Sequence, residues 1–274
     1  MCSNYTPVTD QDRLLAHFGV SRPADAALPE ATFPGLEAFF IRAEDKVDLV
    51  NAQAQLGFFG LLPEWSKDLA FGRHTYNCKS EKVRETKAFK AAWFAGNRCV
   101  IPLEDGFEWC YETGDPVRWR VKGADGAPLA AAGLWGVWIG PHGEQILSFT
   151  MLTVSGEGHA LYSRFNPPQD EKRMPVFLAK EDQDAWLNCP IDEAAAFIRQ
   201  APVEWFAAEP APAPWKPLPE PAEWELEPDM FAEEWRDAAA DPKARELKAR
   251  RSRPKAKAPK PAEPPPPESG DLFG

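Results

Sequence analysis

The sequence predicts an α+β fold, in which a compact mixed β-sheet or open barrel carries short helices and a disordered C-terminal tail follows. Many short runs of branched and aromatic residues are separated by glycine or proline, as β-strands are. Helical spacing is confined to a few short segments, and no internal repeat or glycine-rich phosphate loop is present. Strands that outnumber helices favour this class over a doubly wound sheet.

The individual elements follow from local patterns. Strands are predicted over 38–41, 58–62, 99–102, 118–121, 129–139, 146–154 and 174–178. Helices are predicted over 10–18, 80–95 and 181–187, the first with Thr9 or Asp10 as its N-cap. We expect one folded domain over residues 2–204.

The composition changes near Trp205. About half of the 29 prolines lie beyond it, with an acidic stretch and then a basic run over 243–260. Such a segment cannot bury enough apolar surface to offset the entropy of ordering it. Residues 205–274 are therefore predicted to be a disordered tail.

Composition also limits the class of protein. No apolar run is long enough to span a membrane, and the first residues do not resemble a signal peptide. We therefore expect a cytoplasmic protein. The five cysteines are scattered without a close pair, which argues against a disulfide framework or a zinc site. The four other than Cys2 are predicted to be buried, inert thiols, because an unpaired cysteine behaves as a small apolar residue: Cys78, Cys99, Cys110 and Cys189.

The net charge of −11 is unevenly distributed. Only Glu81 and Glu85 oppose a group of basic residues between positions 73 and 98, namely Arg73, Lys79, Lys82, Arg84, Lys87, Lys90 and Arg98. A local positive field attracts a phosphate backbone even in an acidic protein. On charge alone, a solvated helix face explains the pattern equally well.

Cys2 is the most reactive candidate. Removal of Met1 would leave an amine and a thiol on adjacent carbons. The α-amino group, with an ordinary pKa near 7.7–8.0, is partly neutral at physiological pH. It can condense with an aldehyde, after which the thiol closes a thiazolidine ring. Alternatively, the amine can activate the thiol as an N-terminal nucleophile hydrolase does, or Cys2 has no chemical role.

Six segments in order resemble the SRAP family of abasic-site-processing proteins. They read MCSNY at the start, FGLLPEW over 59–65, YNCKSEKVRET over 76–86, NRCVIP with DGFEW over 97–109, LWG over 134–136 and KRMPVFL over 172–178. The resemblance extends from residue 2 to about residue 190. It implies that Cys2 is the nucleophile, that Asn77 orients it and the opened sugar, and that Glu108 transfers protons.

The resemblance also implies phosphate contacts. Lys79 stands where the family has an arginine, so it supplies charge without a bidentate fork. Arg73, Arg84 and Arg98 are candidate further contacts. Asn4 replaces an arginine of the family, which removes one phosphate ligand while leaving a candidate DNA contact.

The family histidine is the main departure. Its usual position holds Glu171, and a branch with a longer loop has two histidines where this chain has His159 and Asn166. We expect His159 to be the active-site imidazole; a loop histidine without chemistry is the alternative.

The predicted function is covalent crosslinking of Cys2 to abasic sites in single-stranded DNA, in DNA repair and the SOS response, without metal or cofactor. The imine intermediate could also undergo β-elimination, giving AP-lyase activity. The alternatives are an N-terminal cysteine peptidase or hydrolase, including autoproteolysis, and a module that binds DNA junctions without chemistry. A nucleoid-associated monomer is expected. The ending resembles a sliding-clamp-binding peptide through Asp271, Leu272 and Phe273, although its Gln-Leu part is missing; an unstructured terminus is the alternative.

Overall fold

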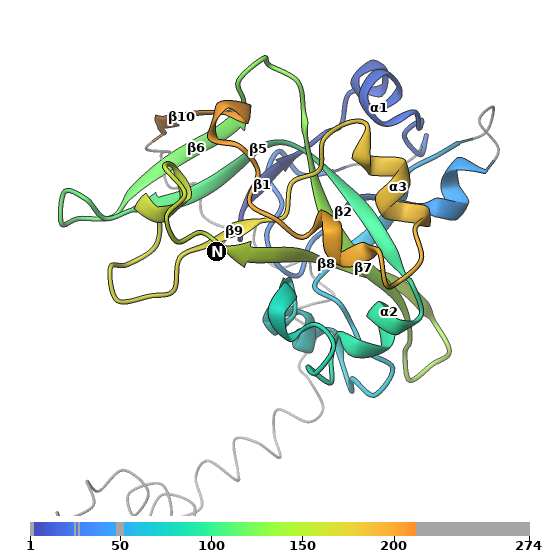
Figure 1. Cartoon of the computed structure of the whole chain (residues 1–274). Helices are drawn as coiled ribbons and strands as arrows, with labels where there is room; N and C mark the ends of the chain where they lie inside the picture. The colour runs from blue at the N-terminus through green and yellow to red at the C-terminus, as the bar shows by residue number, and fades with distance from the viewer. Residues whose placement is uncertain (1–2, 25, 27, 48–51, 212–274) are drawn as a thin grey trace, which may run out of the picture. The chain divides into compact units, whose positions relative to one another are not determined.

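A closed five-stranded barrel forms the centre of the fold (Figure 1). The computed structural model describes residues 3–24, 26, 28–47 and 52–211. The barrel strands are β2 (Glu37–Arg42), β3 (Gln55–Phe59), β5 (Arg98–Cys110), β7 (Leu129–Ile139) and β8 (Gln145–Ser155). Strand β2 pairs with β3 and β5, and β7 pairs with β5 and β8, all antiparallel. Parallel pairing of β3 with β8 closes the barrel, which confirms the predicted α+β class with a mixed sheet.

Shorter strands extend the sheet beyond the barrel. They are β1 (Tyr5–Pro7), β4 (Asn77–Lys79), β6 (Val117–Gly123), β9 (Arg173–Pro175) and β10 (Phe206–Pro210). Strands β1 and β6 pair with the far end of β5, and β4 and β9 pair with β8. Strand β10 pairs with β6, so sheet structure continues into the segment that we assigned to the tail. The expected boundary at residue 205 is therefore too early; residues 212–274 lie outside the described ones.

Both faces of the barrel wall are buried. One apolar cluster contains side chains of all five barrel strands and fills the interior. In it, Phe40 and Phe59 both stack on Phe149, with ring centroids 5.2 and 5.4 Å apart. The alternate residues Phe39 and Ile41 belong to a second cluster, outside the barrel and under the helices. Burial of each such side chain contributes about 1.5–3 kcal/mol to the stability of the fold, so the barrel holds the elements of the site in fixed positions.

The helices are short, as predicted. Helix α1 (Gln11–Phe18) is capped by Asp10, whose carboxylate accepts from Arg13 N at 2.8 Å, and α3 (Asp182–Asn188) lies where a helix was predicted. The 3₁₀ helices are η1 (Ala43–Lys46), η2 (Leu69–His74), η3 (Ser80–Lys82), η4 (Tyr162–Arg164), η5 (Ala194–Phe197) and η6 (Val203–Trp205). Among the described residues, no helix has the length and hydropathy to cross a membrane.

The prediction of one helix over 80–95 is wrong. Only η3 and the short α2 (Lys90–Phe94) form there, with turns between them. Val83 and Ala92 are both buried in the outer cluster. On one continuous helix, nine residues of separation would place them on opposite faces. Tertiary packing therefore overrides the helical propensity of the Lys and Glu residues.

Gly60 ends β3 earlier than the predicted residue 62. Its φ is +139°, and a Cβ there would lie 2.2 Å from the carbonyl oxygen of Gly72. Only glycine permits this approach. The chain turns away from the barrel at this point and leads into η2 and β4, which carry the candidate site.

Candidate active site

Glu108 lies on the part of β5 that projects beyond the barrel. Its side chain is only 2% exposed, and burial raises the pKa of its carboxyl group. Strand β1 runs antiparallel along β5, with Tyr5 opposite Gly106 and Phe107 N donating to Asn4 O at 2.9 Å. Continued by two residues, that register places Ser3 opposite Glu108. The chain therefore approaches this carboxyl group as it enters the fold; Cys2 itself lies outside the described residues.

Asn77 is linked to the same region through aromatic side chains. It opens β4, which runs parallel to β8. The neighbouring Tyr76 packs edge-on against Phe59, with centroids 5.8 Å apart, and Tyr5 packs against the same ring at 5.3 Å. Phe59, the first residue of the 59–65 segment, thus contacts both Tyr5 in the amino-terminal strand and Tyr76, the residue before Asn77. Aromatic packing therefore connects the amino-terminal strand β1 with the residue that precedes Asn77.

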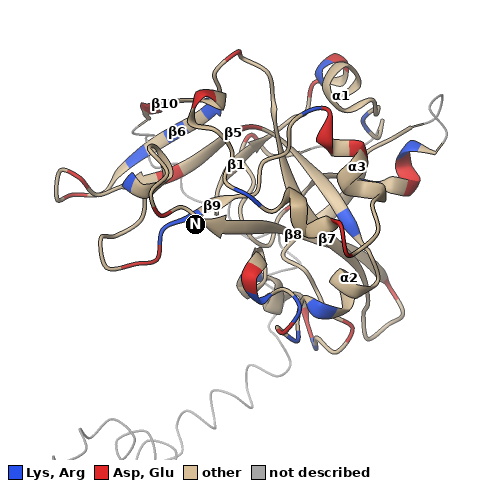
Figure 2. Ribbon diagram, viewed as in Figure 1, with Lys and Arg blue, Asp and Glu red and all other residues tan. Residues whose placement is uncertain are grey.

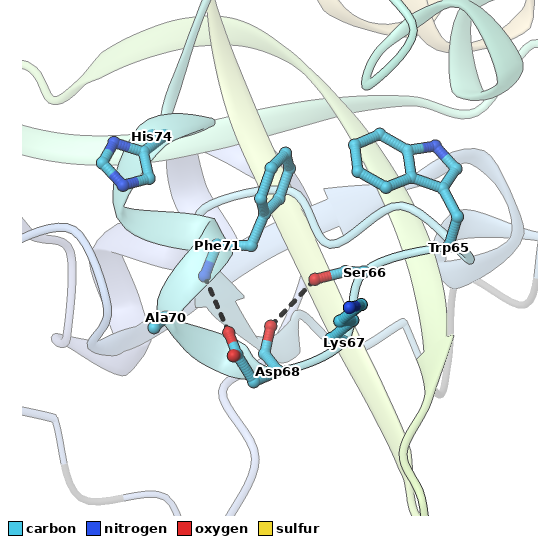
Figure 3. Close-up of a pocket in the computed structure, with 7 residues that line it drawn as sticks. All are labelled: Trp65, Ser66, Lys67, Asp68, Ala70, Phe71 and His74. Atoms are coloured by element: carbon cyan, nitrogen blue, oxygen red, sulfur yellow. Dashed lines mark hydrogen bonds between the residues drawn. The ribbon is translucent and has the colours of Figure 1, made fainter. Parts of the chain in front are cut away.

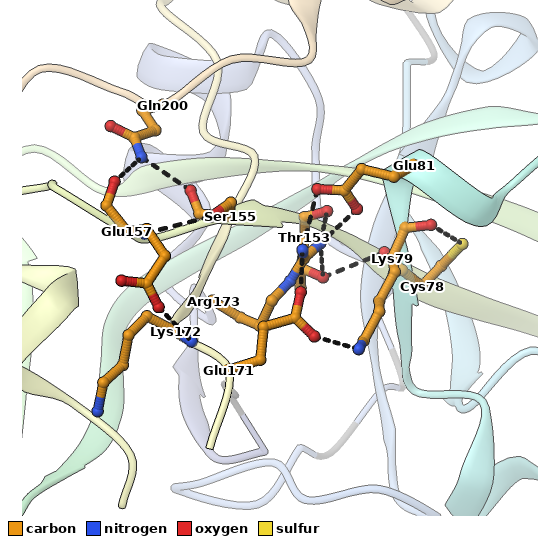
Figure 4. A network of polar contacts seen from close by, with 10 residues as sticks. All are labelled: Cys78, Lys79, Glu81, Thr153, Ser155, Glu157, Glu171, Lys172, Arg173 and Gln200. Carbon is orange, nitrogen blue, oxygen red and sulfur yellow. Dashed lines mark hydrogen bonds and ion pairs between the residues drawn. The ribbon is translucent and has the colours of Figure 1, made fainter. Parts of the chain in front are cut away.

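A polar network holds β4 in place (Figure 4). Arg173 is 2% exposed and donates to both carboxylate oxygens of Glu81 at 2.8 and 2.9 Å and to Thr153 O at 2.6 Å. It also binds Glu171 at 2.9 Å, and Glu171 forms an ion pair with Lys79. Lys79 is therefore exposed but occupied by a carboxylate.

The network shifts its carboxylates toward the charged state. Bonding to Lys79, together with Arg173, lowers the pKa of Glu171. Burial opposes the effect at Glu81, but Arg173 still lowers the pKa of that carboxyl group. Groups with lowered folded-state pKa values stabilise the protein above their ordinary pKa, and this contribution is lost as the pH falls through the folded-state values.

We expect Arg173→Ala to lower the free energy of unfolding by about 2–4 kcal/mol at pH 7, because buried hydrogen bonds and two ion pairs are lost. Urea unfolding followed by circular dichroism measures it. The difference in the free energy of unfolding between wild type and variant should become smaller as the pH falls below the ordinary Glu pKa. Arg199→Ala, which breaks the exposed pair with Asp182, is the control and should cost under about 1 kcal/mol. Equal losses in both variants would contradict a structural network.

The candidate DNA contacts differ in exposure. Arg73 and Arg84 are exposed, and the Arg84 guanidinium lies 5.8 Å from the centre of the Trp93 ring. Arg98 is 5% exposed, and its guanidinium donates to Trp186 O at 2.6 Å and to Cys189 O. It thus binds carbonyls at the end of α3 and is not presented to solvent. Asn4 is 7% exposed and donates to Thr32 O at 3.3 Å.

His159 is engaged by backbone groups on both ring nitrogens. Its Nε2 lies 2.9 Å from Ala201 O, and its Nδ1 lies 3.1 Å from both Leu161 N and Tyr162 N. Two backbone N–H donors at Nδ1 require that nitrogen to accept, which leaves Nε2 to donate to Ala201 O. The ring ties the turn before η4 to residue 201. This geometry does not support the expected role as active-site imidazole.

An open pocket of about 410 Å³ lies along η2, on the segment that leads to Asn77 (Figure 3). Its residues are Trp65, Ser66, Lys67, Asp68, Ala70, Phe71 and His74. Trp65 is 44% exposed, packs edge-on against Phe71 and has the Lys87 ammonium 4.5 Å from its ring centre. Lys87 was predicted only as one of the basic group and Trp65 only as the last residue of the 59–65 segment; neither was expected to lie beside a pocket. An apolar residue within a polar turn was the available signal for Trp65.

Three of the four cysteines that were predicted to be buried are buried: Cys78, Cys99 and Cys110. Burial raises the pKa of Cys78 to about 12 and the pKa of Cys99 well above its ordinary value. Cys110 is 4% exposed, whereas Cys189 is only partly buried. None of the first three thiols is a candidate nucleophile.

The fold and site describe a barrel protein with a buried carboxyl group where its amino-terminal segment joins the sheet. Residues 1–212 match the family described as SOS response associated peptidase (SRAP), and the chain belongs to this family. Abasic site processing protein YoqW of Bacillus subtilis (strain 168) is 27% identical over 196 residues, which are 69% of this chain and 80% of that protein. Abasic site processing protein HMCES of Rattus norvegicus is 30% identical over 163 residues, 47% of this chain and 43% of its own length.

A solved structure has the same fold. The crystal structure of a protein from Bordetella bronchiseptica is 30% identical and superposes with a TM-score of 0.72, covering 77% of this chain and 99% of that one. A second crystal structure, of a protein from Bacteroides thetaiotaomicron, is 19% identical with a TM-score of 0.65 and shares the fold.

Proposed function

We propose that this protein processes abasic sites in single-stranded DNA by bonding Cys2 covalently to the opened sugar. The observation that carries the proposal is the buried Glu108 beside the entering amino-terminal segment, in a chain whose relatives are named abasic site processing proteins. A carboxyl group with a raised pKa holds a proton at higher pH than an exposed one and can donate it to a reacting oxygen.

The reaction needs no external oxidant or reductant. Cleavage of the sugar C1′–O4′ bond, with a proton from Glu108 to O4′ and loss of the C1′ hydroxyl proton, gives a C1′ aldehyde. The neutral Cys2 amine adds to C1′, and uptake of one proton with loss of water gives a protonated imine. The Cys2 sulfur then forms a bond to C1′ while the C=N π electrons move to nitrogen, and the thiol proton leaves, which balances the proton taken up. The product is a thiazolidine; an amide such as that of Asn77 can hold the sugar oxygens by hydrogen bonds.

The DNA strand follows exposed cations and an aromatic side chain. Figure 2 shows Lys and Arg in blue on the segment around η3. Trp65 offers its exposed ring to a neighbouring base, and stacking of this kind contributes about 1–3 kcal/mol. Arg73 and Arg84 are available for phosphates, and Lys79 becomes available when a phosphate displaces Glu171. Arg98 and His159 have no part in this scheme because backbone carbonyls and amides use their polar atoms.

One set of substrates tests the proposal against its alternatives. The full chain is incubated with abasic, intact and reduced-abasic single strands and then heated on a denaturing gel. An adduct with the abasic strand alone is the expected result, since only that strand carries an aldehyde. Binding of all three strands without an adduct would favour a junction-binding module, and cleavage of peptides without an adduct would favour a hydrolase. Retention of Met1, seen by mass spectrometry, would exclude both covalent reactions.

We also propose that the chain end binds the sliding clamp through Asp271, Leu272 and Phe273, which lie outside the described residues. The Leu and Phe side chains would fill an apolar groove on the clamp. Deletion of residues 271–274 should abolish co-precipitation with the clamp while adduct formation is kept. Co-precipitation that survives the deletion would contradict the proposal.

A further inference from the structure

Arg118, on the outward face of β6, has an unusual environment. Its Nη2 donates to Asn4 Oδ1 at 2.7 Å, and its guanidinium carbon lies 3.5 Å from the centre of the Phe107 ring. Its neighbour on the same strand, Arg120, pairs with Asp105 at 2.8 Å. Within the described part of the chain, no ion pair includes Arg118. Among the residues that the structure describes, the guanidinium therefore has an amide and a ring in contact and no carboxylate within ion-pair distance.

Partial burial makes the positive charge of Arg118 energetically unfavourable in the protein without a bound anion. Desolvation lowers the pKa of Arg118, which means that its charge is disfavoured where it stands. The face of an aromatic ring offsets part of that cost. Asn4 accepts from one of the five guanidinium N–H groups, so donors remain for a bidentate acceptor. An anion is the ligand that would compensate this charge.

The position of Arg118 relates it to the candidate active site. Phe107, under the guanidinium, precedes Glu108, and its backbone N–H binds Asn4 O. Asn4 lies two residues from Cys2 along the chain. The register partner of Arg118 is Trp109, whose side chain is 46% exposed. Basic residues mark β6 in blue in Figure 2. A DNA strand that is bound over Glu108 would pass the Arg118 guanidinium.

We propose that Arg118 binds a backbone phosphate of the DNA strand next to the abasic sugar, with Asn4 holding its guanidinium in place. The inference rests on the proposed function and assigns a new residue to the same site. The resemblance implied that the loss of an arginine at position 4 removes a phosphate ligand. In the folded protein, β6 brings another arginine to the side chain of residue 4.

The test measures binding separately from chemistry. The probe is a fluorescein-labelled single strand with a reduced abasic site, which has no aldehyde, and its dissociation constant is measured by anisotropy over a range of salt concentrations. The proteins are the full wild-type chain, Arg118→Gln, Arg118→Lys and, as the matched control, Arg120→Gln. Thermal melting establishes that each variant is folded.

We expect Arg118→Gln to weaken binding about tenfold at low salt and to reduce the slope of log Kd against log salt by about 0.7, the value for one phosphate of a single strand. Arg118→Lys should keep the slope because it keeps the charge, and Arg120→Gln should match wild type. Wild-type affinity and slope in Arg118→Gln would overturn the proposal, as would an equal loss in Arg120→Gln. Wild type that binds the probe but forms no adduct with an abasic strand would refute the proposed function and leave this assignment standing.

Discussion

Cys2→Ala is expected to abolish the heat-stable adduct with an abasic strand. The variant keeps the terminal amine, so it can still form an imine with the aldehyde, but it has no sulfur to close the thiazolidine. Imines hydrolyse readily, whereas the ring persists on heating. Denaturing gels with and without borohydride measure the two species: we expect a borohydride-trapped adduct from Cys2→Ala and no untrapped one.

The matched control for this variant is Cys189→Ala. Cys189 is the partly buried thiol outside the barrel, and its removal should leave the adduct unchanged. A heat-stable adduct of wild-type yield in Cys2→Ala would show that another group bonds to the DNA. Loss of the adduct in both variants would indicate that the loss is not specific to Cys2.

Glu108→Gln is expected to slow adduct formation about 10²–10⁴-fold, the range for removal of one positioned proton-transfer group. Glutamine keeps the shape of the side chain but cannot release or take up the proton. In wild type, the contribution of Glu108 as an acid should be largest below its raised pKa and fall as the pH rises through it. The pH dependence of the single-turnover rate measures this, and the variant should lack that component.

Stability separates this catalytic effect from misfolding. Because burial raises the folded-state pKa of Glu108, its stabilising contribution is present at low pH and is lost as the pH rises through that value. The neutral glutamine should therefore leave the protein at least as stable as wild type at pH 7. Glu104→Gln, on the same strand and bonded to Arg13, is the control and should keep the wild-type rate. A Glu108→Gln rate within about threefold of wild type would remove Glu108 from the mechanism.

Several local predictions were accurate because they depend on residues close in the chain. Strand β7 was predicted at the bounds that it has, since an uncharged, mostly apolar run between Pro128 and Gly140 is a local signal. Asp10 as the cap of α1 follows from its side chain and the N–H three residues on. Burial of Cys99 likewise follows from the apolar Val100 and Ile101 that come after it, whereas Cys78 lies between Asn77 and Lys79 and is buried where β4 pairs with β8.

The candidate site was predictable only in its residue types. The sequence by itself determined that removal of Met1 would leave Cys2 with an amine beside its thiol, and that Glu108 stands between Phe107 and Trp109. The predicted strand ended at residue 102, so only the structure placed Glu108 on a strand. The tertiary structure alone decided that Glu108 lies beside the entering chain, that Arg98 and His159 bind backbone groups, and that Arg118 reaches Asn4. The physical reason is that periodicity shows which face of an element is buried, whereas the partner of a polar atom can lie far along the chain. His159 and Ala201 are 42 residues apart, and Arg118 and Asn4 are 114 apart.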